Sequence, residues 1–330
     1  MPLLTLARME LTWRPLTLAD VEAVTRLCAV AEETDRTGEH WDEGDVRQEM
    51  SGPSVDLPGA SIGAWDGPRL VSYALVVPRA AAEPVHQPHV ASLTDPEHRT
   101  DEVASVLTEW LVRTARNVHA QHFPDAKLEL HAGAHENERW YISLLERGGF
   151  KQERIFVEMR ADLTSLPPAP PLPDDLPLAA CEERYDALVL DARNAAFAGH
   201  WGSTWLSADE WKHRFRGNKD FQPDLSFLLL LSPERDRVVA FVMSSFYEAD
   251  ALATGVRELH VNYVGTLAEA RGRGLASALL AHTLEAGRAA GFERSSLSVD
   301  VDNTHRALAV YERCGYRTAE RNYGYVLPLN

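Results

Sequence analysis

Residues 264–280 read VGTLAEARGRGLASALL, and the order of residue types in this stretch decides the fold. A short apolar segment comes first, two arginines then alternate with two glycines, and apolar residues at helical spacing follow. This order predicts a strand that ends near Thr266, a tight turn, and a helix over about 273–290. Gly291 is predicted to end that helix, because glycine readily adopts the left-handed conformation found after a helix C-terminus.

The turn has the residue types of an anion site. The first backbone N–H groups of a helix have no partner within the helix, and they form the positive end of its macrodipole. Gly272 and Gly274 allow positive φ and leave out the Cβ atoms that would block a ligand, while Arg271 and Arg273 can add charge-assisted contacts. We therefore expect the turn to hold a diphosphate mainly through its backbone. An ordinary surface turn is the alternative, since the sequence has neither the GxGxxG nor the GxxxxGK[ST] nucleotide pattern.

A second copy of this design lies in the first half of the chain. PEHRTDEVASVL at 96–107 aligns with AEARGRGLASAL at 268–279, and LLERGGF at 144–150 aligns with VYERCGY at 310–316. The two matches are separated by similar lengths of chain, as expected for duplicated domains with loop insertions.

A proline-rich stretch, TSLPPAPPLPDDLPL, lies between the two copies. Proline cannot continue a helix or a central strand, and proline clusters favour an extended conformation. We therefore predict a domain at 1–163, a linker at 164–178 and a second domain at 179–330.

The second copy alternates strand and helix patterns. Runs typical of strands lie within 226–246, 257–266, 295–301 and 321–327. The helix near 273–290 and a shorter one that ends near Arg313 are interspersed among these runs. Strands on either side of a crossover helix predict a mixed α/β fold, with a predominantly antiparallel sheet flanked by helices, in two tandem copies.

Composition narrows the classes of function. The 330 residues are 45% hydrophobic and 25% charged, as in an ordinary globular protein, and the net charge of −16 disfavours nucleic acid as a partner. Cys28, Cys181 and Cys314 are widely spaced and odd in number, so neither a disulfide framework nor a metal site is indicated. A leader pattern and an apolar run of about 18 residues are both missing. We expect a cytoplasmic protein, a monomer or homodimer, with no metal and no membrane segment.

Around the turn the sequence resembles the GCN5-related N-acetyltransferase (GNAT) family. The family motif [QR]-x-x-G-x-[GA] reads Arg271-Gly-Arg-Gly274-Leu-Ala276 in this chain. Downstream, the family shows an asparagine, then a tyrosine and then an apolar-Gly-aromatic ending, which match Asn303, Tyr311 and CGY at 314–316. The likeness covers roughly residues 225–327, and it is fainter in the first half.

The resemblance implies acetyl-CoA as co-substrate. It places the pyrophosphate on the turn and the pantetheine along the strand before it. The cofactor-binding residues expected from it are Val264, Gly265, Thr266, Arg271, Gly272, Arg273, Gly274, Leu275, Ala276, Ser277 and Asn303.

Acetyl transfer from a thioester to an amine needs a proton acceptor and a proton donor. By the resemblance, Tyr311 is the donor near the thioester sulfur; a core tyrosine on an amphipathic helix is the alternative. Glu258, His260 and Asn262 alternate onto one face of the strand before the turn. His260 is the first candidate for the base, because imidazole titrates near pH ~6.5. Glu258 is the second, and a structural role remains the alternative for both.

The segment RNAAFAGHWGSTW at 193–205 predicts a helix that ends at Gly199 and a polar-aromatic loop. It resembles a segment of the mycothiol synthases, which are tandem members of the GNAT family. The resemblance implies substrate contacts from Asn194, Phe197, His200 and Trp201. A helix with its C-cap and an anchoring tryptophan is the alternative.

The first copy has lost the residues that this chemistry uses. Thr100, Asp101 and Glu102 replace the glycines and arginine of the turn, and Leu145 replaces Tyr311. Two carboxylates at contact distance from a phosphate repel it, and leucine donates no proton. We predict that the first copy is a non-catalytic GNAT-like domain.

The sequence therefore predicts an N-acetyltransferase, active in its second half. It would move acetyl from acetyl-CoA directly to a primary amine of a small molecule, without a covalent intermediate. One alternative is a mycothiol synthase-like acetylation of a cysteinyl-sugar. Another is a non-catalytic pseudo-enzyme that binds an acyl-CoA or another ligand.

Overall fold

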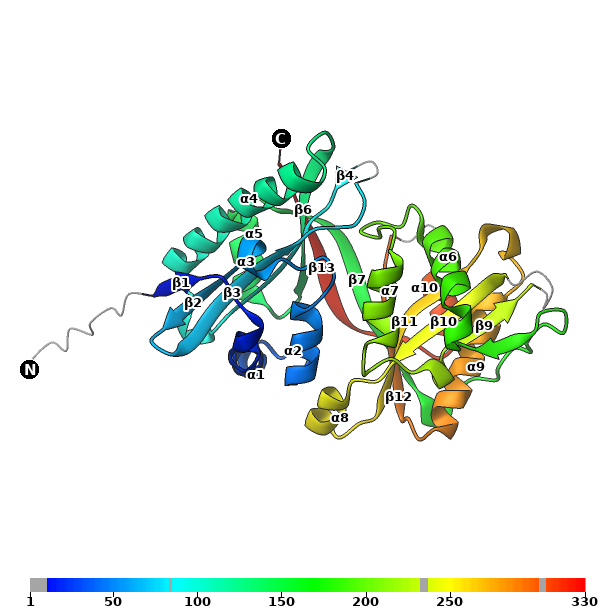
Figure 1. Ribbon diagram of the computed structural model, residues 1–330. Coiled ribbons are helices and arrows are strands. Elements are labelled where there is room, and N and C mark those ends of the chain that lie inside the picture. The colour runs from blue at the N-terminus through cyan, green and yellow to red at the C-terminus, as the bar shows by residue number, and fades with distance from the viewer. Residues whose placement is uncertain (1–10, 83–84, 232–236, 303–306, 330) are drawn as a thin grey trace, which may run out of the picture. The chain divides into compact units, whose positions relative to one another are not determined.

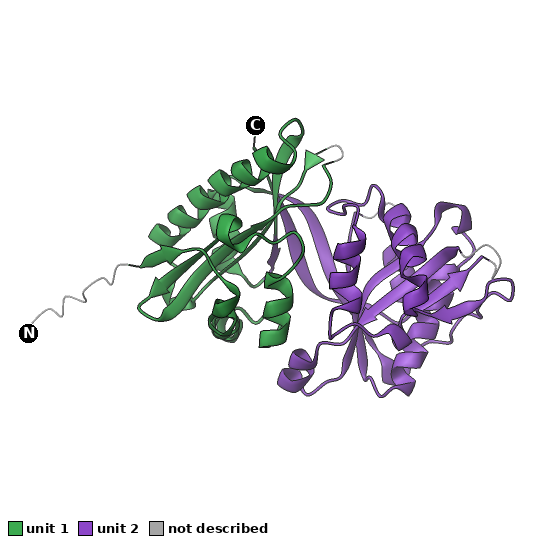
Figure 2. Ribbon diagram, in the orientation of Figure 1, with its two compact units in different colours: residues 1–132, 137–151, 326–330 green, residues 133–136, 152–325 purple. Residues whose placement is uncertain are grey.

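The computed structural model describes residues 11–82, 85–231, 237–302 and 307–329 (Figure 1). They form two compact units, which have different colours in Figure 2. The first unit takes the chain up to residue 132, residues 137–151 and the end from residue 326, and the second takes 133–136 and 152–325. No helix in the described ranges has both the length and the apolar character that a membrane crossing requires.

The first unit is built on a sheet with the strand order β1-β2-β3-β5-β6. The strands are β1 (Thr12–Arg14), β2 (Ser61–Asp66), β3 (Arg69–Val77), β4 (Val85–His86), β5 (His89–Thr94) and β6 (Lys127–His135). The pairs β1-β2, β2-β3 and β3-β5 are antiparallel, whereas β4 and β5 each pair with β6 in parallel. The helices are α1 (Val21–Asp35), α2 (Glu43–Met50), α3 (Leu57–Ala60), α4 (Asp101–His122) and α5 (Arg139–Arg147), with 3₁₀ turns η1 (Leu18–Asp20) and η2 (Pro96–His98).

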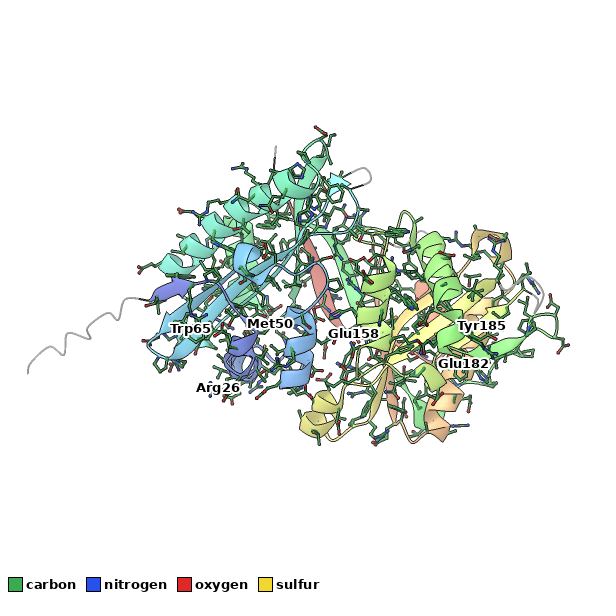
Figure 3. All side chains as sticks on the ribbon, in the orientation of Figure 1. Arg26, Met50, Trp65, Glu158, Glu182 and Tyr185 are labelled. Carbon is green, nitrogen blue, oxygen red and sulfur yellow. The ribbon has the colours of Figure 1, made fainter. Side chains whose placement is uncertain are left out.

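Helices cover this sheet on both faces. The central strand β3 buries side chains on both sides, as a strand between two layers must. α1 and α2 supply one core layer, which includes Met50 and Trp65, labelled in Figure 3. α4 packs on the same strand with a stripe that buries Leu107, Trp110 and Leu111.

The second unit is built on a sheet with the strand order β13-β7-β12-β11-β10-β9-β8. The strands are β7 (Lys151–Asp162), β8 (Leu178–Ala180), β9 (Phe227–Leu230), β10 (Val238–Ser245), β11 (Glu258–Thr266), β12 (Arg294–Asp300) and β13 (Arg317–Pro328). The pairs β7-β12, β11-β10, β10-β9 and β9-β8 are antiparallel, and β11 pairs with β12 in parallel. The helices are α6 (Asp186–Phe197), α7 (Ala208–Trp211), α8 (Glu248–Thr254), α9 (Leu275–Ala289) and α10 (Ala307–Arg313), with short turns η3 (Leu163–Ser165), η4 (Glu183–Tyr185), η5 (Lys212–Arg216), η6 (Pro223–Leu225) and η7 (Ala268–Ala270).

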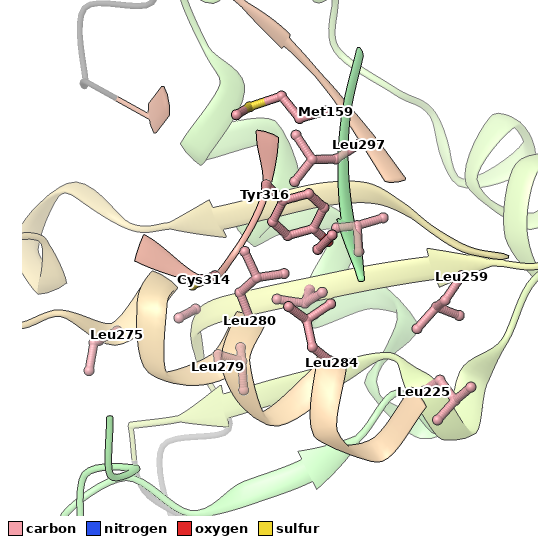
Figure 4. Packing of buried hydrophobic residues seen from close by; sticks show 14 of the residues in the cluster. Met159, Leu225, Leu259, Leu275, Leu279, Leu280, Leu284, Leu297, Cys314 and Tyr316 are labelled. Atoms are coloured by element: carbon pink, nitrogen blue, oxygen red, sulfur yellow. The ribbon is translucent and has the colours of Figure 1, made fainter. Parts of the chain in front are cut away.

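Two apolar layers enclose this second sheet. α9 packs against β10 and β11 with a face that includes Leu275, Leu279 and Leu284, and Tyr316 belongs to the same cluster (Figure 4). α6 and α7 form the other layer with Phe241 of β10. Burying each leucine contributes about 1.5–3 kcal/mol to folding, so these layers hold β11 and the start of α9 in place.

The structure agrees with the predicted fold class, a mixed α/β fold with a mostly antiparallel sheet and flanking helices. The predicted helix over 273–290 is α9, which begins at Leu275 and ends at Ala289. The predicted strands at 226–246, 257–266 and 295–301 correspond to β9, β10, β11 and β12. The last strand is longer than predicted, because β13 begins at Arg317.

The compact units do not divide at the proline-rich stretch. β7 precedes that stretch in sequence, yet it pairs with β12 from Phe156 to Asp162 and so belongs to the second unit. The stretch itself packs on the same unit, since Leu176 lies in its core. The predicted boundaries at 163 and 179 separate the two repeats in the sequence and not the two compact units. We keep them as a proposal for the limits of the duplicated segments.

Candidate active site

β11 separates from its neighbour part-way along the sheet. It pairs with β12 over three residues, the last of them His260, yet it runs on to Thr266. On its other edge the pairing with β10 passes over Asn262, which is the extra residue of a β-bulge. A bulge bends and twists its strand, which accounts for the divergence of β11 from β12 beyond His260.

Among the described residues, the divergence leaves one edge of β11 without a partner strand beyond His260. Leu267 donates its N–H to the C=O of Val239, 2.9 Å away, across the β10 side. Backbone groups alternate in direction along a strand, so Val264 and Thr266 direct their N–H groups to the open edge. An extended ligand that carries amides can pair with such an edge as an added strand does.

Gly265 has a packing role at this point. By the same alternation its backbone faces β10. A Cβ at this residue would lie 2.2 Å from the Phe241 ring. The absence of a side chain is therefore required by the core, and the predicted contact of Gly265 with a cofactor is not supported by its orientation.

The glycine-rich turn is open to solvent. Gly272 and Gly274 have φ of 79° and 75°, the left-handed conformation predicted for them. A Cβ built on either residue meets no atom within 4 Å. α9 starts without a side-chain cap, and its first backbone bond runs from Ala278 N–H to the Gly274 C=O.

The N–H groups of this turn are available to a ligand. Within the described part of the chain, no acceptor receives an N–H from residues 272–277. Leu275 is buried, whereas Ala276 and Ser277 are half-buried, so the helix start is anchored while its backbone stays accessible. This arrangement fits the predicted anion site, because these donors lie at the positive end of a 15-residue helix.

The two arginines of the turn already have protein partners. Arg271 donates from Nε to the Thr266 C=O at 3.3 Å, which closes the turn. Arg273 holds the Asp175 carboxylate with contacts of 2.8 and 2.7 Å, and both side chains are exposed. An exposed ion pair is worth only about 0–1 kcal/mol, so a phosphate can replace Asp175 at Arg273.

Tyr311 lies half-buried on α10. Its ring makes an edge contact with Tyr316, with centroids 6.1 Å apart. The described residues offer its hydroxyl no hydrogen-bond partner, in contrast to Tyr316, whose hydroxyl lies 2.8 Å from Ser295 Oγ. Burial raises the pKa of Tyr311 to about 12, so the phenol keeps its proton at neutral pH. Asn303, the predicted cofactor contact before this helix, lies outside the described residues.

His260 lies where β11 leaves β12. Its Nδ1 is 3.0 Å from Ser296 Oγ, and its ring centroid is 5.7 Å from that of Tyr247. Burial lowers the pKa of His260, which favours the neutral imidazole. When Ser296 accepts the Nδ1 proton, Nε2 keeps a free lone pair, as a base requires.

Glu258 is less suited to be the base. Its carboxylate contacts the Arg294 guanidinium, and Arg160 Nε lies 3.8 Å away. Taking up a proton would therefore break ion pairs that hold β11 to its neighbours. We therefore keep His260 as the proposed base.

Asn194 acts as a clamp within the predicted substrate segment. Its amide donates to the Leu206 C=O at 2.9 Å and accepts the Leu206 N–H at 3.0 Å. These two bonds close the loop that follows α6, and Gly199, with φ of 87°, starts it. Because both ends of the amide are used, the predicted substrate contact of Asn194 is not supported.

The aromatic residues of this segment lie in two places. Phe197 packs on Tyr263, with centroids 5.1 Å apart, and His200 lies against Phe197 at 4.8 Å. Both are therefore near β11. Trp201 instead packs on Phe156 of β7 at 5.8 Å, which fits the anchoring alternative.

Sequence reasoning passed over Arg193, the first residue of this segment, and Tyr263 of β11. Arg193 is 4% exposed, and its guanidinium reaches the Tyr263 hydroxyl at 3.4 Å. An arginine on a helix is ordinarily exposed, so no sequence signal marked it as buried. Tyr263 comes directly after the bulge residue Asn262. The position of the bulge depends on how β11 pairs with β10, so the sequence did not indicate the surroundings of Tyr263.

Comparisons with known proteins bear on this geometry. The acetyltransferase (GNAT) family model matches residues 188–316. A mycothiol acetyltransferase from Frankia alni is 30% identical, covering 96% of this chain and 94% of its own length. The chain belongs to the GNAT acetyltransferase family. It is therefore an acetyltransferase of a family that uses acetyl-CoA, as its sequence predicted.

Other similar proteins cover nearly all of this GNAT chain. A mycothiol acetyltransferase from Parafrankia sp. is 28% identical and covers 97% of this chain and 98% of its own length. Among solved structures, a GCN5-related N-acetyltransferase from Sphaerobacter thermophilus has a TM-score of 0.73 at 21% identity, covering 96% of this chain and 95% of that one. A tandem GNAT protein from the clavulanic acid biosynthesis pathway has a TM-score of 0.67 at 14% identity, covering 97% and 98%. These likenesses confirm the predicted tandem GNAT fold.

Proposed function

We propose that this acetyltransferase moves acetyl from acetyl-CoA to the cysteinyl amine of a mycothiol precursor. The sequence alone favoured an unspecified small-molecule amine and held a cysteinyl-sugar as the alternative. Relatives named mycothiol acetyltransferase that cover nearly all of the chain support the alternative.

One observation carries the proposal: the open edge of β11 leads directly into the uncapped start of α9. Coenzyme A carries a pyrophosphate and, in its pantetheine arm, two amides. In our proposal the N–H groups of residues 272–277 hold the pyrophosphate, and Val264 and Thr266 pair with the pantetheine amides. The residues present thus fit both parts of the co-substrate.

His260 takes the proton of the acceptor in this proposal. An α-amine has a pKa of about 7.7–8.0, against about 10.4 for an alkyl amine. Since burial lowers the pKa of His260, its imidazole is better matched to a cysteinyl α-amine than to a lysine-like one. The local electrostatics therefore support an amino-acyl acceptor.

Tyr311 assists the departure of the thiolate in the proposal. The amine nitrogen bonds to the thioester carbonyl carbon, and the C–S bond breaks. The sulfur receives a hydrogen bond or a proton from the Tyr311 hydroxyl, which has no described protein partner to give up. The products are an N-acetyl cysteinyl compound and coenzyme A with a free thiol.

We further propose that the chemistry takes place in the second unit alone. Its helix start is open, whereas the Thr100 hydroxyl already accepts the Val103 N–H at the start of α4. Leu145 stands at the position of Tyr311 and is fully buried. The first unit would then serve a non-catalytic role.

The experiment is an acetylation assay with the full chain, acetyl-CoA and a cysteinyl amide of an amino sugar. Because the acceptor has its own thiol, coenzyme A and the acetylated product are separated by chromatography and identified by mass. We expect one equivalent of N-acetyl product for each coenzyme A released. Binding of acetyl-CoA without product formation would instead support the pseudo-enzyme.

A further inference from the structure

Arg193 is a buried arginine that has no carboxylate partner in the part of the chain that the structure describes. It lies on α6 one turn before the helix ends, and it is only 4% exposed. Its guanidinium donates to neutral groups only: the Thr204 C=O at 2.6 Å, Ser203 Oγ at 3.1 Å, Asn194 Oδ1 at 3.1 Å and the Tyr263 hydroxyl at 3.4 Å. No carboxylate of the described residues pairs with it, and its Nε has no partner there.

Other arginines of the same unit are neutralised. Arg216 holds Asp186 with contacts of 2.6–2.9 Å, and Arg160 holds Glu320 at 2.9 Å. A buried charge without a counter-charge is unfavourable. The absence of an acid beside Arg193 is therefore a feature that calls for a functional reason.

The surroundings of Arg193 belong to the acceptor side of the proposed site. Its guanidinium carbon lies 5.1 Å from the Tyr263 ring centroid and 5.6 Å from that of Phe197. Tyr263 precedes Val264 on β11, and the Val264 backbone faces the open edge of that strand. The His200 ring contacts the Phe197 ring. The charge thus lies against the side chain of Tyr263, the residue that precedes Val264 on β11.

Two carboxylates of this unit that are not exposed have partners of their own. Glu258 contacts Arg294 and lies near Arg160. Glu210 is 8% exposed, and its Oε2 receives the N–H and hydroxyl of Ser207 at the start of α7. Both acids are committed to partners other than Arg193.

Resting on the proposed function, we propose that Arg193 determines acceptor specificity. Its uncompensated charge disfavours acceptors that carry a second positive charge, and it favours a single amine on an otherwise neutral, hydroxyl-rich molecule. Its hydrogen bonds also position the loop of residues 198–206, together with the Asn194 clamp on Leu206. Polyamines and aminoglycosides are then poor acceptors despite the acidic net charge of −16.

The test compares two acceptors of equal shape. Both are cysteinamides with one acetylatable amine; one ends in a trimethylammonium group and the other in a tert-butyl group. We expect the neutral acceptor to have a kcat/KM about tenfold higher, from Coulomb repulsion between unit charges about 10 Å apart in a partly screened site.

Two variants separate charge from positioning. Arg193→Gln removes the charge and is expected to bring the ratio of the two kcat/KM values close to one. Arg193→Lys keeps a cation but loses the planar fork, so it should lower both kcat values while keeping the preference for the neutral acceptor. If Arg193→Gln does not fold, Ser203→Asp supplies a counter-charge to the intact arginine, with Ser203→Asn as its neutral control.

Each outcome decides the proposal. A parent enzyme that acetylates both acceptors equally, or a neutralised variant that keeps the parent's ratio, overturns the specificity role while leaving the proposed acetylation intact. An enzyme that acetylates neither cysteinamide overturns the proposed function, and this inference with it.

Discussion

The turns that precede α4 and α9 share an arginine that donates to a backbone carbonyl, but they differ in how the helix begins. In the first unit Arg99 donates from Nε to the Thr94 C=O at 3.1 Å, and in the second Arg271 does the same to Thr266 at 3.3 Å. Each turn also contains a 3₁₀ segment, η2 or η7. The arginine is therefore a structural part of the turn in both copies, whether or not a ligand binds.

The difference begins one residue later. Thr100 has φ of −109° and its hydroxyl accepts the Val103 N–H at 3.3 Å, so α4 begins at Asp101 with its own cap. Gly272 has φ of 79°, and α9 begins only at Leu275 without a cap. The first copy satisfies its helix start internally and adds acids that complement the macrodipole, whereas the second leaves its helix start without a side-chain cap.

The ends of α5 and α10 share a backbone motif but differ in one side chain. Phe150 donates its N–H to Leu145 at 3.0 Å in the first copy, and Tyr316 donates to Tyr311 at 3.1 Å in the second. Both motifs place a glycine with positive φ just before the aromatic residue. A single side chain, leucine or tyrosine, then decides whether a proton donor is present.

Importing the first turn into the second should have the largest effect. Gly272→Thr/Gly274→Glu puts side chains at left-handed positions, each costing about 1–2 kcal/mol, and adds a carboxylate beside the phosphates. We expect acetyl-CoA to bind about 100-fold more weakly, or worse, in isothermal titration. Gly291→Glu, with similar strain at the other end of α9, is the control and should bind normally. Retained affinity in the double variant would mean that the cofactor binds elsewhere.

Removing the hydroxyl of Tyr311 tests the contrast with Leu145. Tyr311→Phe should lower kcat by about 10²-fold or more, because general acid assistance is worth about 10²- to 10⁴-fold. The KM for acetyl-CoA should change little. The matched control is Tyr316→Phe, which removes a hydroxyl bound to Ser295 and should affect stability rather than turnover. Equal effects on kcat from both variants would contradict a donor role for Tyr311.

The pH dependence of turnover tests whether His260 is the base. A base must be neutral, so kcat should fall as the pH drops through the pKa of His260, which burial sets below 6.5. His260→Gln should remove this acidic limb and lower the plateau about tenfold or more. Glu258→Gln should keep the limb, and its disappearance in that variant would assign the base to Glu258 instead. The ionisation of the acceptor amine gives a second limb that all three enzymes share.

Features set by neighbours in sequence were predictable, and features set by distant contacts were not. The turn, its two left-handed glycines and α9 follow from the order of residues between Thr266 and Leu284. The bulge at Asn262 depends on how β11 pairs with β10, and no residue type marks it. The sequence therefore did not predict that β11 separates from β12, which is the feature that opens the proposed site.

The acceptor side shows the same limit. Asn194 was predicted to contact the substrate. Its side-chain amide instead makes two hydrogen bonds with the Leu206 backbone, because the loop folds back on α6. From sequence alone, Arg193 is expected on the surface. In the fold its guanidinium contacts the Tyr263 hydroxyl. The predicted division at the proline-rich stretch marks the copies in sequence, but β7 pairs with β12 beyond it.

The smallest expected effect lies in the cap of the first copy. Thr100→Ala removes the hydroxyl that accepts the Val103 N–H, and loss of such a cap lowers the free energy of unfolding by about 1 kcal/mol. Urea denaturation should detect this loss, whereas Thr100→Ser, which keeps the hydroxyl, should unfold nearly like the parent. Acetyl-CoA affinity and kcat should stay unchanged in both variants, because the cap satisfies a helix rather than a ligand. Weaker acetyl-CoA binding in Thr100→Ala at parental stability would show that the first turn also takes part in cofactor binding.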